Sequence, residues 1–290
     1  MKPLIVILSL LSALPISLSA QGVSTTKIDE ALGRSGQKSG EVYRVAFPRS
    51  DLHVSVAGAE IKAGLALGSW AAFSGSDRDA MVMGDLVLLE DELNPVIKSL
   101  RSAGFQITAV HNHLMGESPR ILYAHYMGHG EVSQIAESLR AALTKTKTPL
   151  GKPATPTQPV ETPAFVKTVQ DILGTNGRFA GGVLSFGIPR AEEITDHGKT
   201  LTGAQGVAES INFQESGSGK VATTGDFVLR SEEVNPVISA LEEHDIQVTA
   251  LHSHLRTEQP RLFFMHFWAN GSTESVAQGI KAALSKVHTK

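Results

Sequence analysis

Apolar and polar residues follow a strand-like pattern in the front half of a unit that occurs twice in this chain. Alternation, or enrichment in β-branched residues with Gly and polar residues in between, is typical of strands. In the first copy the predicted strands are residues 42–47, 52–57, 65–73 and 80–89.

The back half of the unit mixes helical and strand patterns. Asn94 and Pro95 are typical of a helix N-cap and first position, and the apolar stripe that follows predicts a helix ending at Gly104. Strands are predicted at 106–113 and 120–127. The closing helix has four apolar residues on one face: Val132, Ile135, Leu139 and Leu143. This β-α-β-β-α order predicts an α+β fold, with two tandem homologous domains that are each an antiparallel sheet with helices packed on one face.

The second copy follows the first at a constant offset of 141 residues. His111 recurs as His252 and His125 recurs as His266, and the copies align without a gap. From Gly84 to His125, 20 of 42 positions are identical to their partners 141 residues later. The chain therefore arose by duplication of one domain, although equal function of the two copies does not follow.

Five prolines separate the two copies: Pro149, Pro153, Pro156, Pro159 and Pro163. Prolines at this spacing prevent a helix or a central strand and favour an extended linker. We therefore expect a first domain at 26–143, a Pro/Thr-rich linker at 144–166 and a second domain at 167–285.

The first twenty residues (1–20) have the composition of a secretory signal peptide. Lys2 precedes an uncharged Leu/Ile-rich run, and Ser19-Ala20 precedes the expected cleavage point. An uncleaved anchor is the alternative, since the uncharged run approaches the ~20 residues that a membrane-spanning helix needs. Pro15 and the small residues at the end of the run favour cleavage. We expect a secreted or periplasmic protein with no membrane span in the mature chain.

Composition and charge exclude several classes of protein and site. A hydrophobic content of 41% and a charged content of 19% are typical of globular proteins. The formal charge is −3 and the sequence has no long basic run, which argues against nucleic acid as a partner. The chain has no cysteine. Lipoprotein anchoring through an N-terminal Cys, disulfides and thiolate metal ligands are therefore excluded.

The candidate chemistry lies in a His-x-His-x-x-x-Glu motif near the end of each copy. Residues i and i+2 of a strand face the same side, so His111 and His113 can converge on one metal ion. If Ala109 pairs with His125 on the next strand, His125 joins them on that face. A register one residue different would put His125 on the opposite face, and the sequence leaves this choice open.

Six histidines and two glutamates are the candidate metal ligands: His111, His113, Glu117, His125, His252, His254, Glu258 and His266. Glu117 and Glu258 are also candidate general bases for catalysis. Asp85 and Asp226 each follow a glycine, and they are candidates for carboxylates that orient a histidine. With nitrogen and oxygen ligands and no sulfur, the divalent transition metals Zn, Mn, Fe, Ni and Cu all fit.

Other interpretations of the motif stay open. Histidine pairs on strands can simply form hydrogen bonds in a half-buried sheet. Arg120 and Arg261 lie beside the motifs and suggest an anion-binding site, or a cell-wall or glycan-binding module that needs no metal. A metal-dependent enzyme acting on a cell-envelope compound is a further alternative, in which a ligand position stays open for substrate.

The motifs resemble those of two known families. His-x-His-x-x-x-Glu resembles the first metal motif of cupins, but the next histidine follows too closely and a helix precedes the motif strand, so we do not expect a cupin fold. Five strings resemble the bacterial LppY/LpqO family: Met83–Leu88, Glu92–Val96, Val110–Leu114, Glu117–Arg120 and Phe263–Asn270. This resemblance implies a duplicated domain of unknown function that is often exported, and it implies no reaction. The lack of cysteine departs from the lipoprotein members.

These patterns lead to one hypothesis. The chain is an exported two-domain protein with a His-x-His-x3-Glu…His site in each repeat, and each site binds a divalent metal ion. A cell-wall glycan or a small envelope molecule is the expected partner.

Overall fold

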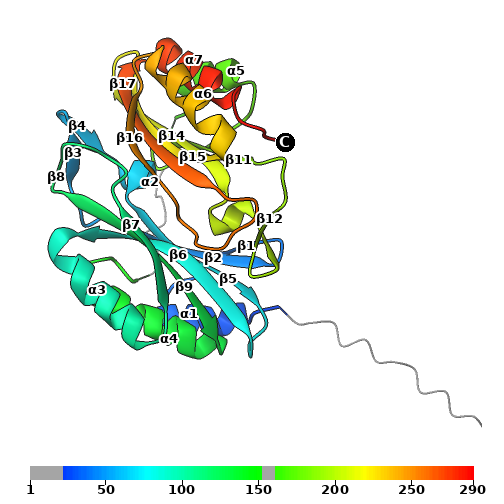
Figure 1. Ribbon diagram of the computed structural model, residues 1–290. Coiled ribbons are helices and arrows are strands. Elements are labelled where there is room, and N and C mark those ends of the chain that lie inside the picture. The colour runs from blue at the N-terminus through cyan, green and yellow to red at the C-terminus, as the bar shows by residue number, and fades with distance from the viewer. Residues whose placement is uncertain (1–21, 152–160) are drawn as a thin grey trace, which may run out of the picture.

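A computed structural model describes residues 22–151 and 161–290, and within these ranges the chain forms two similar halves (Figure 1). Each half is an antiparallel sheet with helices on one face, which confirms the predicted α+β fold. The signal peptide predicted at 1–20 and the centre of the predicted linker lie outside the described residues. In the described part of the chain, no helix has the length and apolar character needed to cross a membrane.

The first half contains a six-stranded antiparallel sheet in the order β1-β2-β5-β6-β9-β7 and a small three-stranded sheet in the order β4-β3-β8. Its elements are α1 (Thr25–Leu32), β1 (Gln37–Ser39), β2 (Val42–Pro48), β3 (Val54–Val56), β4 (Ala59–Ile61), α2 (Ala63–Ala66), β5 (Gly68–Gly75), β6 (Ala80–Leu89), α3 (Glu90–Ser102), β7 (Gln106–His111), β8 (Glu117–Ser118), β9 (Ile121–Gly130) and α4 (Val132–Leu143).

The second half repeats this topology, with a sheet in the order β10-β11-β14-β15-β17-β16 and a separate β12-β13 hairpin. Its elements are α5 (Ala164–Leu173), β10 (Arg178–Ala180), β11 (Val183–Pro189), β12 (Ile194–Asp196), β13 (Lys199–Leu201), the short 3-10 helix η1 (Gly203–Gln205), β14 (Ala208–Gly217), β15 (Lys220–Leu229), α6 (Ser231–Glu242), β16 (Gln247–His252), β17 (Phe263–Ser272) and α7 (Thr273–Leu284). Helix α5 begins three residues before the predicted start of the second domain.

The two sheets face each other, and the helices lie on the outer sides (Figure 1). In each half a large apolar core fills the space between sheet and helices. The apolar stripe predicted for α4 is part of the first core, since Val132, Ile135, Leu139 and Leu143 are all buried. This arrangement leaves the inner face of each sheet for contact with the other half.

A small hairpin from each half packs on the sheet of the other half. The β3-β4 hairpin shares an apolar cluster with Val183, Ala222 and Trp268 of the second half. In the reciprocal cluster, the β12-β13 hairpin packs with Met81 and Met127 of the first half. Met81 and Ala222 occupy equivalent positions 141 residues apart, as do Met127 and Trp268. The two halves are therefore related by an approximate twofold axis that passes between the sheets.

Helix α3 begins at Glu90, so the prediction that Asn94 and Pro95 start it is wrong. The Glu92 carboxylate accepts a hydrogen bond of 3.0 Å from the N–H of Leu89 and caps the first turn. The same carboxylate lies 2.7 Å from the fully buried guanidinium of Arg49. Proline removes one backbone donor at the sixth position of the helix, but the acidic first turn and its buried ion pair fix the start earlier.

The strand register also corrects the gap-free alignment of the two copies. Trp70 pairs with Asp85, whereas Ser210 pairs with Asp226. Trp70 and Ser210 are therefore counterparts at an offset of 140 (210 − 70), although Asp85 and Asp226 differ by 141 (226 − 85). The second copy has one residue fewer before β12 and one more in the turn between β14 and β15.

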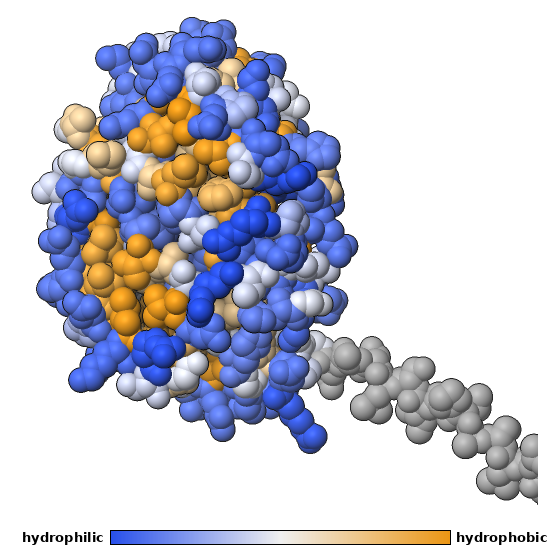
Figure 2. Space-filling model, in the orientation of Figure 1, coloured by the Kyte–Doolittle hydropathy of each residue, from blue (hydrophilic) through white to orange (hydrophobic). Residues whose placement is uncertain are grey.

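Apolar surface gathers on the face that carries β7 and β16 (Figure 2). These two strands form equivalent edges of the two sheets. The large hydrophobic side chains exposed in the described residues are Val110, Met115 and Leu251, with exposed fractions of 45%, 52% and 44%. Val110 and Leu251 are repeat counterparts, so the duplication extends to this surface.

Candidate metal centre

The strand register places the third histidine of each copy on the face of the first. Ala109 pairs with His125, and Ala250 pairs with His266. This is the register that the sequence left open, and it puts the imidazoles of His111 and His125 on one side of the sheet, with ring centroids 5.1 Å apart. Strand β7 ends at His111, two residues earlier than predicted, so His113 projects from the loop that follows.

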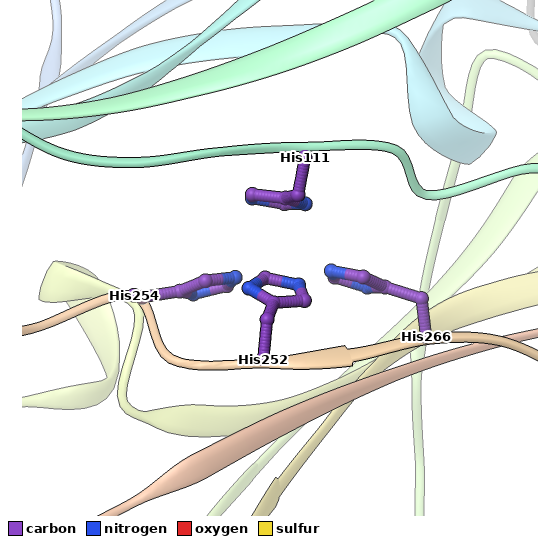
Figure 3. A group of neighbouring side chains, drawn as sticks. All are labelled: His111, His252, His254 and His266. Atoms are coloured by element: carbon purple, nitrogen blue, oxygen red, sulfur yellow. The ribbon is translucent and has the colours of Figure 1, made fainter.

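The six motif histidines meet in a single cluster between the two halves. Figure 3 shows His111 approaching from the first half, opposite three histidines of the second half. Each histidine ring of one copy lies against a ring of the other copy. The distances between ring centroids are 3.8 Å for His111–His252, 3.7 Å for His113–His266 and 3.7 Å for His125–His254. The structure thus joins the two predicted sites into one shared site.

These contacts follow the approximate twofold axis. His111 and His252 are counterparts of each other, so their contact lies on the axis. The pair His113–His266 is exchanged with the pair His254–His125, and both have a spacing of 3.7 Å. An aromatic ring closes the cluster on each side, where Tyr123 stacks on His113 and its counterpart Phe264 stacks on His254. The duplication is therefore what builds the site, since neither half holds it alone.

The cluster is rich in buried nitrogen atoms without hydrogen-bond partners. All six histidines contribute a buried Nε2 atom that has no partner among the described residues, and His252 also contributes Nδ1. A buried polar group without a partner costs roughly 1–3 kcal/mol. A protein core does not gather so many of these groups by packing alone. A bound cation would give several of these lone pairs a common partner.

Four of these histidines have ring nitrogens within 4.8 Å of one another: His111, His252, His254 and His266. Neighbouring backbone carbonyl groups help to determine which ring nitrogen of His111 and of His266 faces the other histidines. The Nδ1 atom of His111 lies 3.2 Å from the carbonyl oxygen of Asn112, and that of His266 lies 3.1 Å from the carbonyl oxygen of Gly225. A hydrogen bond from Nδ1–H to a backbone carbonyl leaves the Nε2 lone pair free for a metal.

Five histidines of the cluster favour the neutral imidazole: His111, His113, His125, His252 and His254. Burial, together with the neighbouring imidazoles, lowers the pKa of His125 to about 3 and that of His252 to about 4. The pKa values of His111, His113 and His254 are also lowered by burial, and the surrounding histidines act in the same direction. A neutral imidazole is the form that binds a metal ion.

Asp85 and Asp226 lie beside the cluster on the two central strands. Oδ1 of Asp226 is 3.0 Å from Nδ1 of His266, and Oδ2 of Asp85 is 3.7 Å from Nε2 of His125. Burial would raise the pKa of Asp226, but His266 lowers it below the usual range. Burial and the charge of Asp226 raise the pKa of Asp85 well above its usual value. The two equivalent carboxyls therefore differ, because the pKa of Asp226 is lowered and that of Asp85 is raised.

A glycine before each aspartate lets the neighbouring strand approach closely. A Cβ atom at Gly84 would collide with the carbonyl oxygen of Trp70, and one at Gly225 with that of Ser210. Asp85 and Asp226 are thereby set in the middle of the sheet, where β6 and β15 face the cluster.

The glutamates and arginines of the motifs lie elsewhere. Oε1 of Glu117 accepts from the backbone N–H of Ile121, and Oε1 of Glu258 accepts from that of Leu262, so both close the loop after the motif. Neither carboxylate belongs to the groups of neighbouring ligand atoms in the described residues. Arg261 lies 3.3 Å from Glu258. Arg120 is exposed and lies 3.6 Å from Glu90.

A cavity of about 950 Å³ opens between the two sheets beside the cluster. His113, His125 and His254 line it at the cluster, which we call its inner end, and Arg44 and Trp70 line it from β2 and β5. The sequence did not single out Arg44 or Trp70, because neither has a matching residue in the second copy. The strand pattern of 42–47 and 65–73 gave the one available signal, since it placed both in strands of the same sheet.

Comparison with known proteins identifies the family of the chain. No curated protein matches it. Two solved structures share low similarity with it: a trimeric bacterial microcompartment shell protein PduB (10% identity, TM-score 0.20, 87% of this chain and 89% of that chain) and EtuB from Clostridium kluyveri (11% identity, TM-score 0.20, 87% and 88%). Similarity this low supports no conclusion about fold or function. Residues 26–145 and 167–286 each match one profile, and the chain therefore belongs to the family described as Domain of Unknown Function (DUF1259).

Proposed function

We propose that this protein binds one transition-metal ion between its two domains, through the imidazoles of His111, His252, His254 and His266. The observation that carries the proposal is the convergence of their buried, unpartnered Nε2 atoms from both halves. The lowered pKa values of His111, His252 and His254 support it, as do the carbonyl contacts at Nδ1 of His111 and His266. Asp226, beside Nδ1 of His266, would orient that ligand.

The donor set narrows the choice of metal. Four imidazoles without a carboxylate or thiolate suit Zn, Cu, Ni or Fe, whereas Mn prefers oxygen ligands. A four-histidine shell fixes the two halves against each other. The metal is therefore a link between domains as well as a possible source of chemistry.

A metal-dependent enzyme is the second candidate, and the cavity favours it. The cavity reaches His113, His125 and Asp85, which lie beside the proposed ligands. When bound, the metal would supply Lewis-acid chemistry at the inner end of the cavity. Asp85, a buried carboxyl on the cavity wall, could exchange a proton there, whereas Glu117 and Glu258 accept hydrogen bonds within their own loops.

The place of the protein in the cell is also part of the proposal. The composition of residues 1–20 supports export, and the motif strings quoted above support a relationship with the LppY/LpqO proteins within the DUF1259 family. A small envelope compound or a glycan is the partner we propose.

Elemental analysis of the chain, purified without a histidine tag, tests the metal proposal. We expect about one transition-metal ion per chain, and less than about a tenth of that in His252→Ala and His266→Ala, since each removes a central ligand. His53→Ala and His288→Ala are matched controls, because their side chains are 88% and 71% exposed and lie outside the cluster. Metal-poor wild-type protein after incubation with each candidate ion, or metal retained in both cluster variants, would contradict the proposal.

A further inference from the structure

The cationic side chain of Arg44 also lines the cavity beside the histidine cluster. Arg44 projects from β2, and its guanidinium lies 3.8 Å from the centre of the Trp70 ring. Burial lowers its pKa to about 10, so it remains a cation at neutral pH. Nη1 donates to the carbonyl oxygen of Ala204 at 2.6 Å. Among the described residues, no carboxylate lies within salt-bridge distance of the half-buried Arg44, although the carboxyl of Asp85 acts from further away to raise its pKa.

One row of paired residues connects this arginine to the histidines. Across the sheet, Trp70 pairs with Asp85, and Asp85 pairs with His125. On β2, Ala46 pairs with Trp70, and Arg44 lies two residues away on the same face. Strands β2 and β9 are three spacings apart in the sheet, or about 14 Å. The arginine and the proposed metal thus face the same cavity from opposite ends.

Trp70 holds the arginine in place. One face of the indole carries the guanidinium, and the backbone at Gly206 packs so closely that an added Cβ would lie 3.1 Å from the ring. A cation over the face of a tryptophan is stabilised by the ring quadrupole. Trp70 therefore positions Arg44, whose other N–H groups have no hydrogen-bond partner among residues 22–151 and 161–290.

The second half lacks both residues. The counterpart of Arg44 is Ser185, and the structural counterpart of Trp70 is Ser210. The row nevertheless continues as in the first half, because Asp226 and His266 are the counterparts of Asp85 and His125. The scaffold is symmetric around the axis, but the guanidinium stacked on an indole occurs on one side of it. Such a difference is expected where the cavity binds an asymmetric molecule.

Part of the cavity wall between the two ends is apolar. Met83 and Met127 pair with each other across β6 and β9, and both line the cavity with Val207 and Phe264. Gln205 donates to the sulfur atom of Met83. A ligand that fits this lining has a charged head, an apolar body and a second polar end.

We propose that the cavity binds an organic oxyanion whose carboxylate or phosphate group pairs with Arg44, whose apolar body lies along Met83 and Met127, and whose other end reaches the histidine cluster. The part of the proposal that concerns the inner end rests on the proposed metal function. The part that concerns Arg44 does not, because it depends on the guanidinium and its surroundings. Guanidinium groups bind such oxyanions through two parallel hydrogen bonds.

Calorimetric titration tests the proposal with hexanoate, hexylphosphonate and the linear dicarboxylates of four to eight carbons. Hexanoate or hexylphosphonate should bind to both the metal-free and the metal-loaded chain. The difference in affinity between these two anions shows whether the site prefers a carboxylate or a phosphate group. A dicarboxylate of suitable length should bind the metal-loaded chain more tightly than hexanoate. Hexanamide, which lacks the charge, should not bind measurably.

Arg44→Ser, which installs the residue of the second half, should weaken binding by about 10- to 100-fold. The affinity of Arg44→Lys should lie between that of Arg44→Ser and that of the wild type, since lysine keeps the charge but lacks the paired N–H donors of a guanidinium. Arg120→Ser, at an arginine that is 58% exposed outside the cavity, is the control and should bind as the wild type does. Metal content is measured on every sample, so loss of metal would be recognised separately. The proposal is overturned if neither six-carbon anion binds the wild type, or if Arg44→Ser and Arg44→Lys bind as tightly as Arg120→Ser.

Discussion

Saturating metal should raise the thermal unfolding midpoint of the intact chain by about 10 °C. A ligand that binds the folded state alone stabilises it by RT ln(1 + [L]/Kd), which is about 4 kcal/mol at a thousandfold excess over Kd. For a chain of this size, each kcal/mol raises the midpoint by roughly 2–4 °C. The effect is large here because the proposed ligands come from both halves, so separating the halves also releases the ion. Differential scanning calorimetry of metal-free and metal-loaded protein measures it.

The control for this experiment is His266→Ala, which removes a ligand common to both groups of neighbouring side chains. Its midpoint should not respond to metal. A midpoint shift of the same size in this variant would show that the ion stabilises the protein from another place. An unchanged wild-type midpoint at saturating metal would count against a role in linking the halves.

Acidification should destabilise the metal-free protein between pH 6.5 and pH 5. A histidine with a lowered pKa in the folded state stays neutral there, whereas the unfolded chain takes up a proton near pH 6.5. Since the unfolded state then binds more protons, stability is fully present above pH 6.5 and falls as the pH is lowered. His125 and His252, with pKa values of about 3 and 4 in the folded protein, should each contribute about 2 kcal/mol of loss by pH 5. Urea unfolding at several pH values measures the trend.

A single-site variant checks the origin of this pH dependence. His252→Ala should lose about 2 kcal/mol less than the wild type between pH 6.5 and pH 5, because one titrating group is gone. His288→Ala, at an exposed position, should follow the wild type. Equal slopes for all three proteins would mean that the buried histidines do not govern acid stability.

The sequence predicted the long strands and the closing helix because each has a strong local signal, but it missed α1, β1, β4 and α2, and the strand predicted at 65–73 begins within α2. The apolar stripe of α4 and the strand patterns in β2 and β6 depend on residues close together in the chain. The predicted start of α3 was wrong for the opposite reason. Asn94-Pro95 is a good local signal, but Glu92 forms a buried pair with Arg49, and that contact is invisible to a local pattern.

The site was predictable in its residues but not in its assembly. The matched histidines identified the residues of the cluster. The strand register that pairs Ala109 with His125 could not be predicted, because it depends on the conformation of the loop between β7 and β9. That two sheets face each other depends on contacts between residues more than a hundred positions apart. One signal was present, since residues 80–89 are apolar on both faces of the strand and every residue but Leu89 is buried. Arg44 was not predicted, because its counterpart in the second copy is Ser185 and the repeated motifs therefore do not include it.

X-ray absorption at the metal edge of the loaded, intact chain tests the shared centre most directly. We expect one ion per chain, surrounded by about four imidazole nitrogens at about 2.0–2.1 Å. His111→Ala should remove one of the four, because His111 is the ligand that the first half supplies. A spectrum dominated by oxygen ligands, two ions per chain, or an unchanged imidazole shell in His111→Ala would contradict a single metal centre built by both repeats.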